Sequence, residues 1–393
     1  MGGVLKEVLG QYIYSVIIIE LLMGGCQIPI ELFLERPNYD RLVSVLWLED
    51  EIDRVPFYEH LVDLEVIEHL LRVKLRRIDM SRREGKVNYL RYLVKFFKSL
   101  RYDCVPFELP LKLPRNNVLF TEDTARLSRG FRRWLDEHRG VIMKMIDFES
   151  YPWPNQEDAI DYEMMEILCK ILPENMGVVG GVGGGIFEHT VWLMGFTPFF
   201  KALYCERKLV EAMFRRIGKL ITDVLKVLAE YDKIVILRMG DDLGSRNGTF
   251  ISPSMLRKYI FPWYREAVKI AHKHGKPFIL HSCGNLSAIM NDLIDWVGID
   301  GKHSYEDTIM PVTEAKRLYG SRIAILGGID VDKLSRYPKD EFTSYVKEVM
   351  RKCCPGGGYA LGSGNSITNY VDINNYLEML KLGVKYGKYF LKV

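Results

Sequence analysis

The chain has 393 residues and is 48% hydrophobic, so it can bury a large core without needing disulfides or metals for stability. Its formal net charge is +3, which argues against the strong basic field of a nucleic-acid-binding protein. The seven cysteines form no CxxC pair and no regular framework, which favours a reducing, cytoplasmic setting.

Residues 1–38 are predicted to form an N-terminal extension. Its apolar stretch, YIYSVIIIELLMGG, is interrupted by Glu20 and is too short to span a bilayer. Few positive charges precede it, and no small-residue cleavage site is clear. We therefore favour an accessory segment, with a targeting or membrane-surface segment as the alternative, and expect no membrane association of the main domain.

From about Tyr39 onward, short apolar runs alternate with amphipathic helices. The first half offers three candidate strands: RVPFYEH (54–60), YDCVPFE (102–108) and MGVVGGVGGG (176–185). The segment between the second and third is predicted to be an insertion, with a helix over 123–138 and a hairpin over 139–154.

The second half predicts five consecutive strand–helix units. Its strands lie within 233–242, 277–285, 298–306, 322–330 and 356–365. Ser252 and Pro253 are typical of a helix start, Pro262 of a break and Gly275 of an end. Eight strands without a dinucleotide-binding fingerprint favour a closed (β/α)8 (TIM) barrel over residues 39–393, rather than an open sheet.

Polar side chains gather where these strands end, which is where TIM barrels place their chemistry. In FILHSCGN, His281 and Cys283 are two residues apart at a strand end and can converge on one ion. Imidazole and thiolate suit zinc, and Glu306 at the end of the next strand would complete a set of three ligands with one open position. The alternative is a structural histidine beside an inert buried cysteine.

Asp241 and Asp242 end the preceding strand. Either carboxylate could orient a substrate or exchange a proton, as could His281, so we regard all three as candidate catalytic residues. The alternative for the aspartates is a solvated capping or turn pair. Four further rim residues are candidate substrate contacts: Asn247, His303, Ser363 and Asn365.

The segment VVGGVGGGIFEH (178–189) looks like a phosphate loop but lacks its Lys-Ser/Thr pair and the GxGxxG register. Its glycines either let the backbone approach a flat ligand or permit a sharp exit from the strand, and both interpretations stay open. We assign the histidines outside 281 and 303 to the core or the surface.

Taken together, GDDLGSRNGTFISP, FILHSCGN, ILGGID and GGGYALGSGNSI make the chain resemble the uroporphyrinogen decarboxylase superfamily. The resemblance covers about residues 40–390 and implies a (β/α)8 barrel. The superfamily also contains zinc methyltransferases that act on methylated corrinoids.

The two branches imply different chemistry. The decarboxylases carry an arginine-rich segment after the first strand, whereas this chain has YEHLVDLEVIEHLL there. The methyltransferases use the His and Cys of an HxC motif, matched by His281 and Cys283, and another cysteine where this chain has Asn365. Glu306 corresponds to an acidic position that some of the zinc enzymes use.

We therefore expect zinc-assisted methyl transfer involving a corrinoid and a thiol or another small methyl acceptor or donor. The alternatives are decarboxylation of uroporphyrinogen III to coproporphyrinogen in porphyrin biosynthesis, and a non-catalytic tetrapyrrole-binding barrel. A small-molecule or tetrapyrrole substrate is expected; a corrinoid protein and a second copy of the chain are candidate partners.

Overall fold

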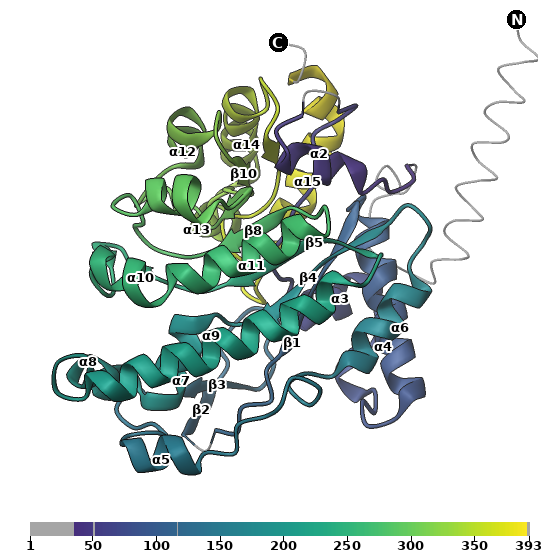
Figure 1. Ribbon diagram of the computed structural model, residues 1–393. Helices are drawn as coiled ribbons and strands as arrows, with labels where there is room; N and C mark the ends of the chain where they lie inside the picture. Colours follow the sequence, from purple (N-terminus) through teal and green to yellow (C-terminus); the bar gives the residue numbers. More distant parts are fainter. Residues whose placement is uncertain (1–34, 50–51, 116, 391–393) are drawn as a thin grey trace, which may run out of the picture.

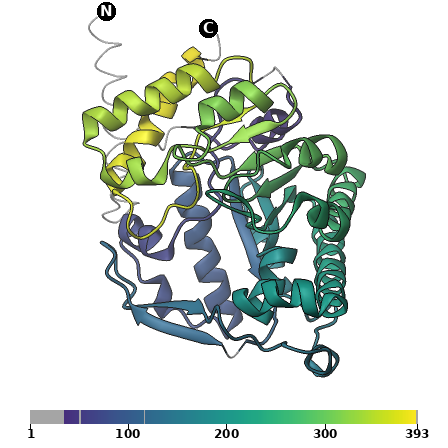
Figure 2. The same cartoon turned by 90° about the vertical axis from the view of Figure 1, so that its left-hand side faces the viewer.

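Seven parallel strands form one curled sheet in the computed structural model, which describes residues 35–49, 52–115 and 117–390 (Figures 1 and 2). The predictions for residues 1–34 lie outside the described residues. The sheet has the spatial order β1-β4-β5-β8-β9-β10-β11. Its strands are β1 (Cys104–Pro110), β4 (Gly177–Gly183), β5 (Ile234–Gly240), β8 (Phe278–His281), β9 (Gly301–His303), β10 (Ala324–Leu326) and β11 (Tyr359–Ala360).

The first predicted strand, residues 54–60, lies beside β11 but forms only a single parallel bridge, between Phe57 and Leu361. Two backbone hydrogen bonds flank this bridge, from Tyr58 to Leu361 and from Leu361 to Pro56. The described residues therefore show the predicted alternation of strands and helices and a parallel sheet of seven strands, beside which residues 54–60 form only a bridge.

Helices follow the strands and cover the outer face of the sheet (Figure 1). The α-helices before β5 are α2 (Asp40–Leu46), α3 (Leu64–Leu71), α4 (Arg83–Ser99), α5 (Met145–Ser150), α6 (Tyr162–Ile171), α7 (Ile186–Met194), α8 (Phe196–Cys205) and α9 (Arg207–Ala229). Those after it are α10 (Pro253–Tyr259), α11 (Phe261–Lys273), α12 (Val312–Tyr319), α13 (Val331–Arg336), α14 (Lys339–Cys353) and α15 (Ile373–Phe390). Single turns of tighter or wider helix occur at Leu75–Arg77 and Asp292–Val297.

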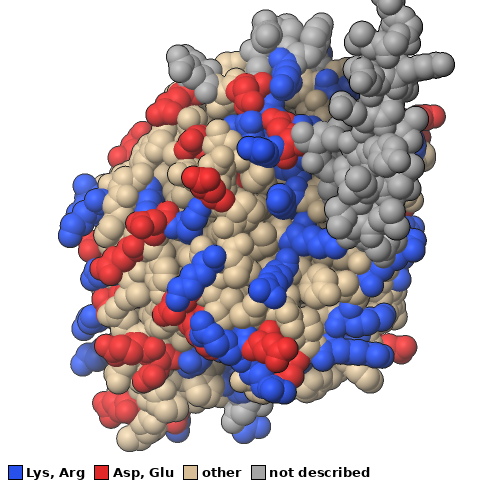
Figure 3. Space-filling model, turned by 90° about the vertical axis from the view of Figure 1, so that its right-hand side faces the viewer, with Lys and Arg blue, Asp and Glu red and all other residues tan. Residues whose placement is uncertain are grey.

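The local signals in the second half act as predicted. Ser252 accepts a hydrogen bond from the backbone N–H of Met255 and so caps α10, and Pro253 occupies its first turn. The helical segment is divided between Tyr259 and Phe261, just before Pro262. No described helix is both long and apolar enough to cross a bilayer. Lys and Arg alternate with Asp and Glu on the face shown in Figure 3, in agreement with the nearly balanced charge.

The concave face of the sheet has a core of its own. Alternate residues of the central strands, among them Ile236 of β5 and Ile279 of β8, point to this face and are fully buried. Helix α2 closes the end of this space where the strands begin, since its Leu42, Val45 and Leu46 belong to the same cluster. The polar residues at the other ends of the strands therefore stand on a rigid apolar base.

The insertion between β1 and β4 differs from its prediction. The helix predicted over 123–138 is wrong: β2 (Val118–Glu122) and β3 (Phe131–Leu135) form an antiparallel hairpin there. Asp123 makes the turn, since its carboxylate accepts the backbone N–H groups of Ala125 and Arg129. The hairpin predicted over 139–154 is also wrong, because that segment contains the short helix α5. A second small hairpin joins β6 (Gly244–Ser245) to β7 (Gly248–Thr249).

Candidate metal centre

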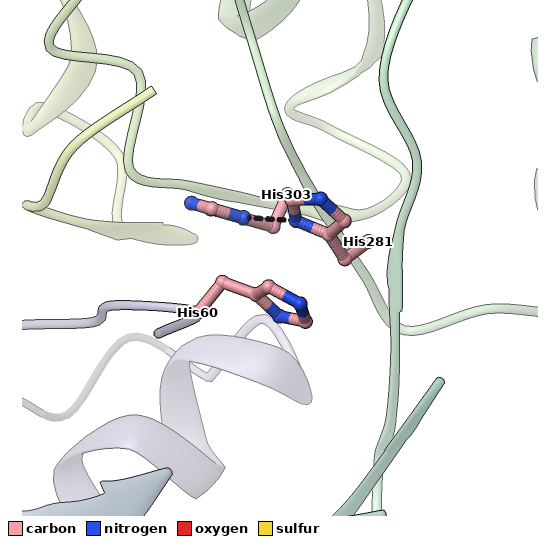
Figure 4. Close-up of side chains that lie close together, drawn as sticks. All are labelled: His60, His281 and His303. Atoms are coloured by element: carbon pink, nitrogen blue, oxygen red, sulfur yellow. Dashed lines mark hydrogen bonds between the residues drawn. The ribbon is translucent and has the colours of Figure 1, made fainter. Parts of the chain in front are cut away.

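Three imidazoles meet at the carboxyl end of the sheet (Figure 4). His281 of β8 and His303 of β9 are register partners on neighbouring parallel strands, so their side chains leave the same face of the sheet. His60 comes from the bridged segment beside β11, and its ring stacks on that of His281 with centroids 3.8 Å apart and planes 12° apart. All three side chains are buried.

These three rings are poorly placed to hold one ion together, although their nearest nitrogens lie within 4.8 Å of one another. Nδ1 of His281 is 2.7 Å from Nδ1 of His303, so those two nitrogens share a hydrogen bond. Stacked rings also hold their in-plane lone pairs parallel rather than convergent. We therefore regard the three-histidine cluster as structural support for a neighbouring group.

That neighbouring group consists of Asp242, His281 and Cys283, whose ligand atoms also lie within 4.8 Å of one another. Nε2 of His281 is 3.5 Å from Sγ of Cys283 and 3.9 Å from Oδ1 of Asp242. The same Oδ1 accepts the backbone N–H of Cys283 at 2.8 Å, which fastens the β8 loop to the end of β5. One thiol, one imidazole and one carboxylate form a donor set that suits zinc.

Two side chains from the loops after β9 and β11 donate hydrogen bonds to the sulfur of Cys283. Ser304 Oγ and Asn365 Nδ2 each lie 3.3 Å from Sγ. Burial, together with the nearby Asp242 carboxylate, raises the pKa of the Cys283 thiol to about 12. The thiol therefore stays protonated near neutral pH unless a positive charge binds beside it, while two donors stand ready to stabilise its thiolate.

The backbone around this sulfur is strained and held in place. Ser304 has a φ of 85°, a conformation that a residue with a side chain rarely adopts. The buried ammonium of Lys302 donates to the carbonyls of Ser282, His303 and Ser304 and so joins the ends of β8 and β9. Burial lowers the pKa of Lys302 to about 8.

Asp241 lies apart from the sulfur and serves a structural contact. Its fully buried carboxylate accepts the backbone N–H groups of Phe187 and Glu188, each at 2.9 Å, and the hydroxyl of Tyr264 at 2.7 Å. It thus binds the N-terminus of α7, the helix that follows the glycine-rich segment. A Cβ on Gly185 would lie 2.2 Å from the Cβ of Asp241. The glycine here permits close approach of a neighbouring carboxylate, an interpretation that neither sequence-based reading included.

The remaining predicted residues are distributed unevenly. Glu306 is in neither of the ligand groups that the described residues form, and it faces the pocket described below. Asn247 lies exposed in the turn between β6 and β7. Ser363 is fully buried, and its backbone N–H and hydroxyl both donate to the carboxylate of Glu59. Asn365 and His303 are beside the cluster, as described above.

Sequence reasoning missed His60, which it assigned to the core or the surface together with other histidines. The available signal was its position at the end of the first predicted strand, the same position that singled out His281. His60 is held by Arg238, whose buried guanidinium donates to the carbonyl of His60 at 2.6 Å. Burial lowers the pKa of both His60 and His281 well below the usual range, so both imidazoles are neutral.

A pocket opens next to the sulfur. Apolar side chains of the two loops after β8 and β9 line it, and Ser304 connects it to Cys283 through the hydrogen bond at 3.3 Å. Its lining residues are Gly284, Asn285, Leu286, Ser287, Met290, Lys302, Ser304, Tyr305, Glu306, Ile309, Met310 and Tyr319. Through Ser304 and Gly284 the pocket adjoins the His281–Cys283–Asp242 cluster.

Comparisons with known proteins show the family and the fold. The family model described as uroporphyrinogen decarboxylase (URO-D) matches residues 139–386, more than half of the chain. A methyltransferase from Methanosarcina mazei has a similar structure, with a TM-score of 0.66 and 17% sequence identity over 89% of this chain and 99% of that one. At this identity the likeness concerns the fold.

A second solved structure, a β-L-arabinopyranosidase from Geobacillus stearothermophilus, aligns at 10% identity over 88% of this chain and 79% of that one. Its TM-score of 0.37 is too low to bear on the fold. No curated protein matches the chain.

Proposed function

Because the chain belongs to the uroporphyrinogen decarboxylase family, we propose that it is a methyltransferase that binds zinc and exchanges a methyl group between a corrinoid and a small thiol. The observation that carries this proposal is the convergence of His281, Cys283 and Asp242 at the carboxyl end of the sheet. We further propose that residues 54–60 are the eighth strand of a (β/α)8 barrel, with its rim at this cluster.

The residues present fit a zinc ion. They offer one neutral imidazole, one thiol and one carboxylate, which leaves a fourth position for a substrate. In this proposal Asp242 takes the role that the sequence suggested for Glu306. When bound, zinc would lower the pKa of a coordinated thiol and hold it as a thiolate near neutral pH.

The protein's own groups would stabilise the Cys283 thiolate and adjoin the substrate thiol. Ser304 and Asn365 direct N–H or O–H donors at Sγ of Cys283 and so stabilise negative charge on the sulfur. The pocket beyond Ser304, with Leu286, Met290 and Met310 in its lining, would present apolar side chains to a thiol substrate at its mouth.

The reaction itself balances without another reagent. The methyl group leaves the cobalt of the corrinoid and forms a carbon–sulfur bond, the cobalt keeps the electron pair of the broken bond, and the thiol proton passes to solvent. The reverse reaction uses the same groups. In this proposal Asp242, whose side chain is 40% exposed, acts as a metal ligand and not as the acceptor of that proton.

Decarboxylation of a porphyrinogen has less support. That reaction needs a carboxylate free to stabilise a pyrrole cation. Both oxygens of Asp241 are already occupied by two backbone N–H groups and a tyrosine hydroxyl. Oδ1 of Asp242 accepts the backbone N–H of Cys283 and lies in the metal-binding group, so we assign this carboxylate to metal binding.

The test is demethylation of methylcobalamin by 2-mercaptoethanol, followed by the absorbance change of the corrinoid. We expect turnover by the zinc-loaded protein and none by Cys283→Ala. Cys205→Ala is the matched control, since Cys205 is an exposed cysteine at the end of α8. Equal rates for wild type and Cys283→Ala, or uroporphyrinogen decarboxylation by both, would contradict the proposal.

A further inference from the structure

The hydrogen bonds around His303 determine which nitrogen of His281 is free. Nε2 of His303 lies 3.0 Å from the carbonyl oxygen of Ser363. A carbonyl oxygen can only accept, so Nε2 of His303 must carry the proton. That carbonyl is itself well fixed, because it also accepts the backbone N–H of Gly328 at 3.0 Å.

The neutral state of the two rings follows from their surroundings. His303 is fully buried, and the buried ammonium of Lys302 donates to its backbone carbonyl. Its ring has no carboxylate partner among the described residues, so a second, unpaired charge there would be costly. A neutral imidazole carries a single N–H. Since Nε2 of His303 has it, Nδ1 of His303 is bare and must accept the hydrogen bond that it shares with His281.

His281 must then donate from Nδ1, which leaves its Nε2 without a proton. Nε2 is the nitrogen that faces Sγ of Cys283 at 3.5 Å and Oδ1 of Asp242 at 3.9 Å. A ring nitrogen binds a metal only through its free lone pair. The hydrogen bond to His303 therefore leaves a free lone pair on Nε2 of His281, the nitrogen that faces Cys283 and Asp242.

We propose that His303 is a positioning residue that, held by the carbonyl of Ser363, fixes His281 in the tautomer whose Nε2 can bind a metal ion. The tautomer follows from the hydrogen bonds and the burial of the two rings, whereas the metal it serves rests on the proposed function. The predicted role of His303 as a substrate contact is replaced here by a role exerted through His281.

Glu59 extends this arrangement one step further into the protein. Its buried carboxyl group accepts both the backbone N–H and the hydroxyl of Ser363 and so holds this residue, whose carbonyl meets His303, in place. Partners that orient a metal-binding histidine in this way typically change metal affinity by about 10- to 100-fold when they are removed.

The direct test is long-range ¹H–¹⁵N NMR of the metal-free protein with ¹⁵N-labelled histidine, which reports the protonated nitrogen of each ring. We expect a proton on Nδ1 of His281 and on Nε2 of His303. A proton on Nε2 of His281 in the folded wild type would overturn the proposal, whether or not the protein binds zinc.

Two variants test the consequence for metal binding, with zinc alone as the probe and a competing chelator to measure its Kd. His303→Leu removes the acceptor, and we expect about a 10- to 100-fold loss of zinc affinity together with a proton on Nε2 of His281. His303→Asn can place an amide oxygen near the former Nδ1 and should retain most of the affinity. Equal losses in two folded variants would show that His303 acts only through packing, which contradicts the proposal.

The two proposals fail in different ways. A wild-type protein with the expected tautomers but no zinc binding would end the proposed function and leave the tautomer assignment intact. If the protein binds zinc but His281 carries its proton on Nε2 in the metal-free state, the tautomer assignment is wrong and the proposed function stands.

Discussion

Asp241 and Asp242, adjacent at the end of β5, should respond differently to substitution by asparagine: the first variant should lose stability and the second zinc affinity. Asp241→Asn replaces a fully buried acceptor of three hydrogen bonds. An amide has one accepting atom, so at least one bond is lost and an NH2 group faces another donor. Hydrogen bonds to charged groups contribute about 1.5–3 kcal/mol each, so we expect the free energy of unfolding to fall by about 2–4 kcal/mol.

Asp242→Asn removes much less stabilisation. The side chain is 40% exposed, and an amide oxygen can keep the single bond to the backbone N–H of Cys283. We expect a stability change within about 1 kcal/mol. Zinc affinity should fall by at least about tenfold, equivalent to ~1.4 kcal/mol, because a neutral amide is a weaker ligand than a carboxylate.

Urea denaturation and zinc titration of both variants measure the two effects. The rate of Cys283 alkylation against pH adds a third readout in the metal-free protein. Loss of the Asp242 charge should lower the pKa of the thiol from about 12, whereas Asp241→Asn should leave it unchanged. The reasoning would be refuted if Asp241→Asn weakened zinc binding as much as Asp242→Asn while leaving the protein equally stable.

Three further predictions follow from the same structure. Asn365→Cys, kept reduced, should raise zinc affinity by about tenfold or more in a chelator competition, because a second thiolate would join the ligands. Nδ2 of Asn365 is 3.3 Å from Sγ of Cys283, so a side chain at this position can reach the cluster. Unchanged affinity would mean that residue 365 does not reach the metal. Gly185→Ala should lower the free energy of unfolding, measured in urea, by about 1–3 kcal/mol, because the new Cβ would lie 2.2 Å from Asp241. Gly183→Ala is the control and should be tolerated, since a Cβ there has no neighbour closer than 3.8 Å. Equal effects of the two substitutions would disprove the close contact. Burial lowers the pKa of His189 to about 3 in the folded protein, against about 6.5 in the unfolded chain, so the stability that the neutral ring contributes is complete above pH 6.5 and is lost as the pH falls toward 3. Between pH 7 and 5 the free energy of unfolding, measured in urea, should therefore fall by about 2 kcal/mol more for the wild type than for His189→Gln. Parallel losses in the two proteins would mean that His189 is protonated when folded.

Much of the fold could be predicted because its signals are local. The apolar runs at 233–242 and 277–285 contain β5 and β8, and Ser252 caps a helix as its type predicts. The insertion could not be predicted in this way. Its hairpin depends on the turn at Asp123, and the mixture of charged and apolar residues around that turn does not distinguish a helix from a strand.

The site was predicted in part, for a physical reason. The positions of His281 and Cys283 at a strand end indicated convergence, and their ligand atoms are 3.5 Å apart. The third predicted ligand, Glu306, was chosen only because it ends the next strand along the chain. Ser304, with its φ of 85°, turns the chain after β9, and Glu306 then lines the pocket instead of joining the cluster, a turn that no spacing rule anticipates.

His60 shows a second limit of the sequence pattern. Its strand is reduced to one bridge, and the stacking of its ring on His281 depends on how the sheet curls from β1 round to β11. A contact between residues 221 positions apart has no local signature. Only the assembled sheet brings these two rings together.

The central claim is that His281, Cys283 and Asp242 hold one zinc ion. Zinc-edge X-ray absorption of the zinc-loaded protein tests it most directly. We predict one bound zinc per chain with a single sulfur neighbour at about 2.3 Å and nitrogen or oxygen neighbours at about 2.0–2.2 Å, and loss of the sulfur shell in Cys283→Ser. A zinc ion with no sulfur neighbour, or a sulfur shell unchanged in Cys283→Ser, would contradict the account.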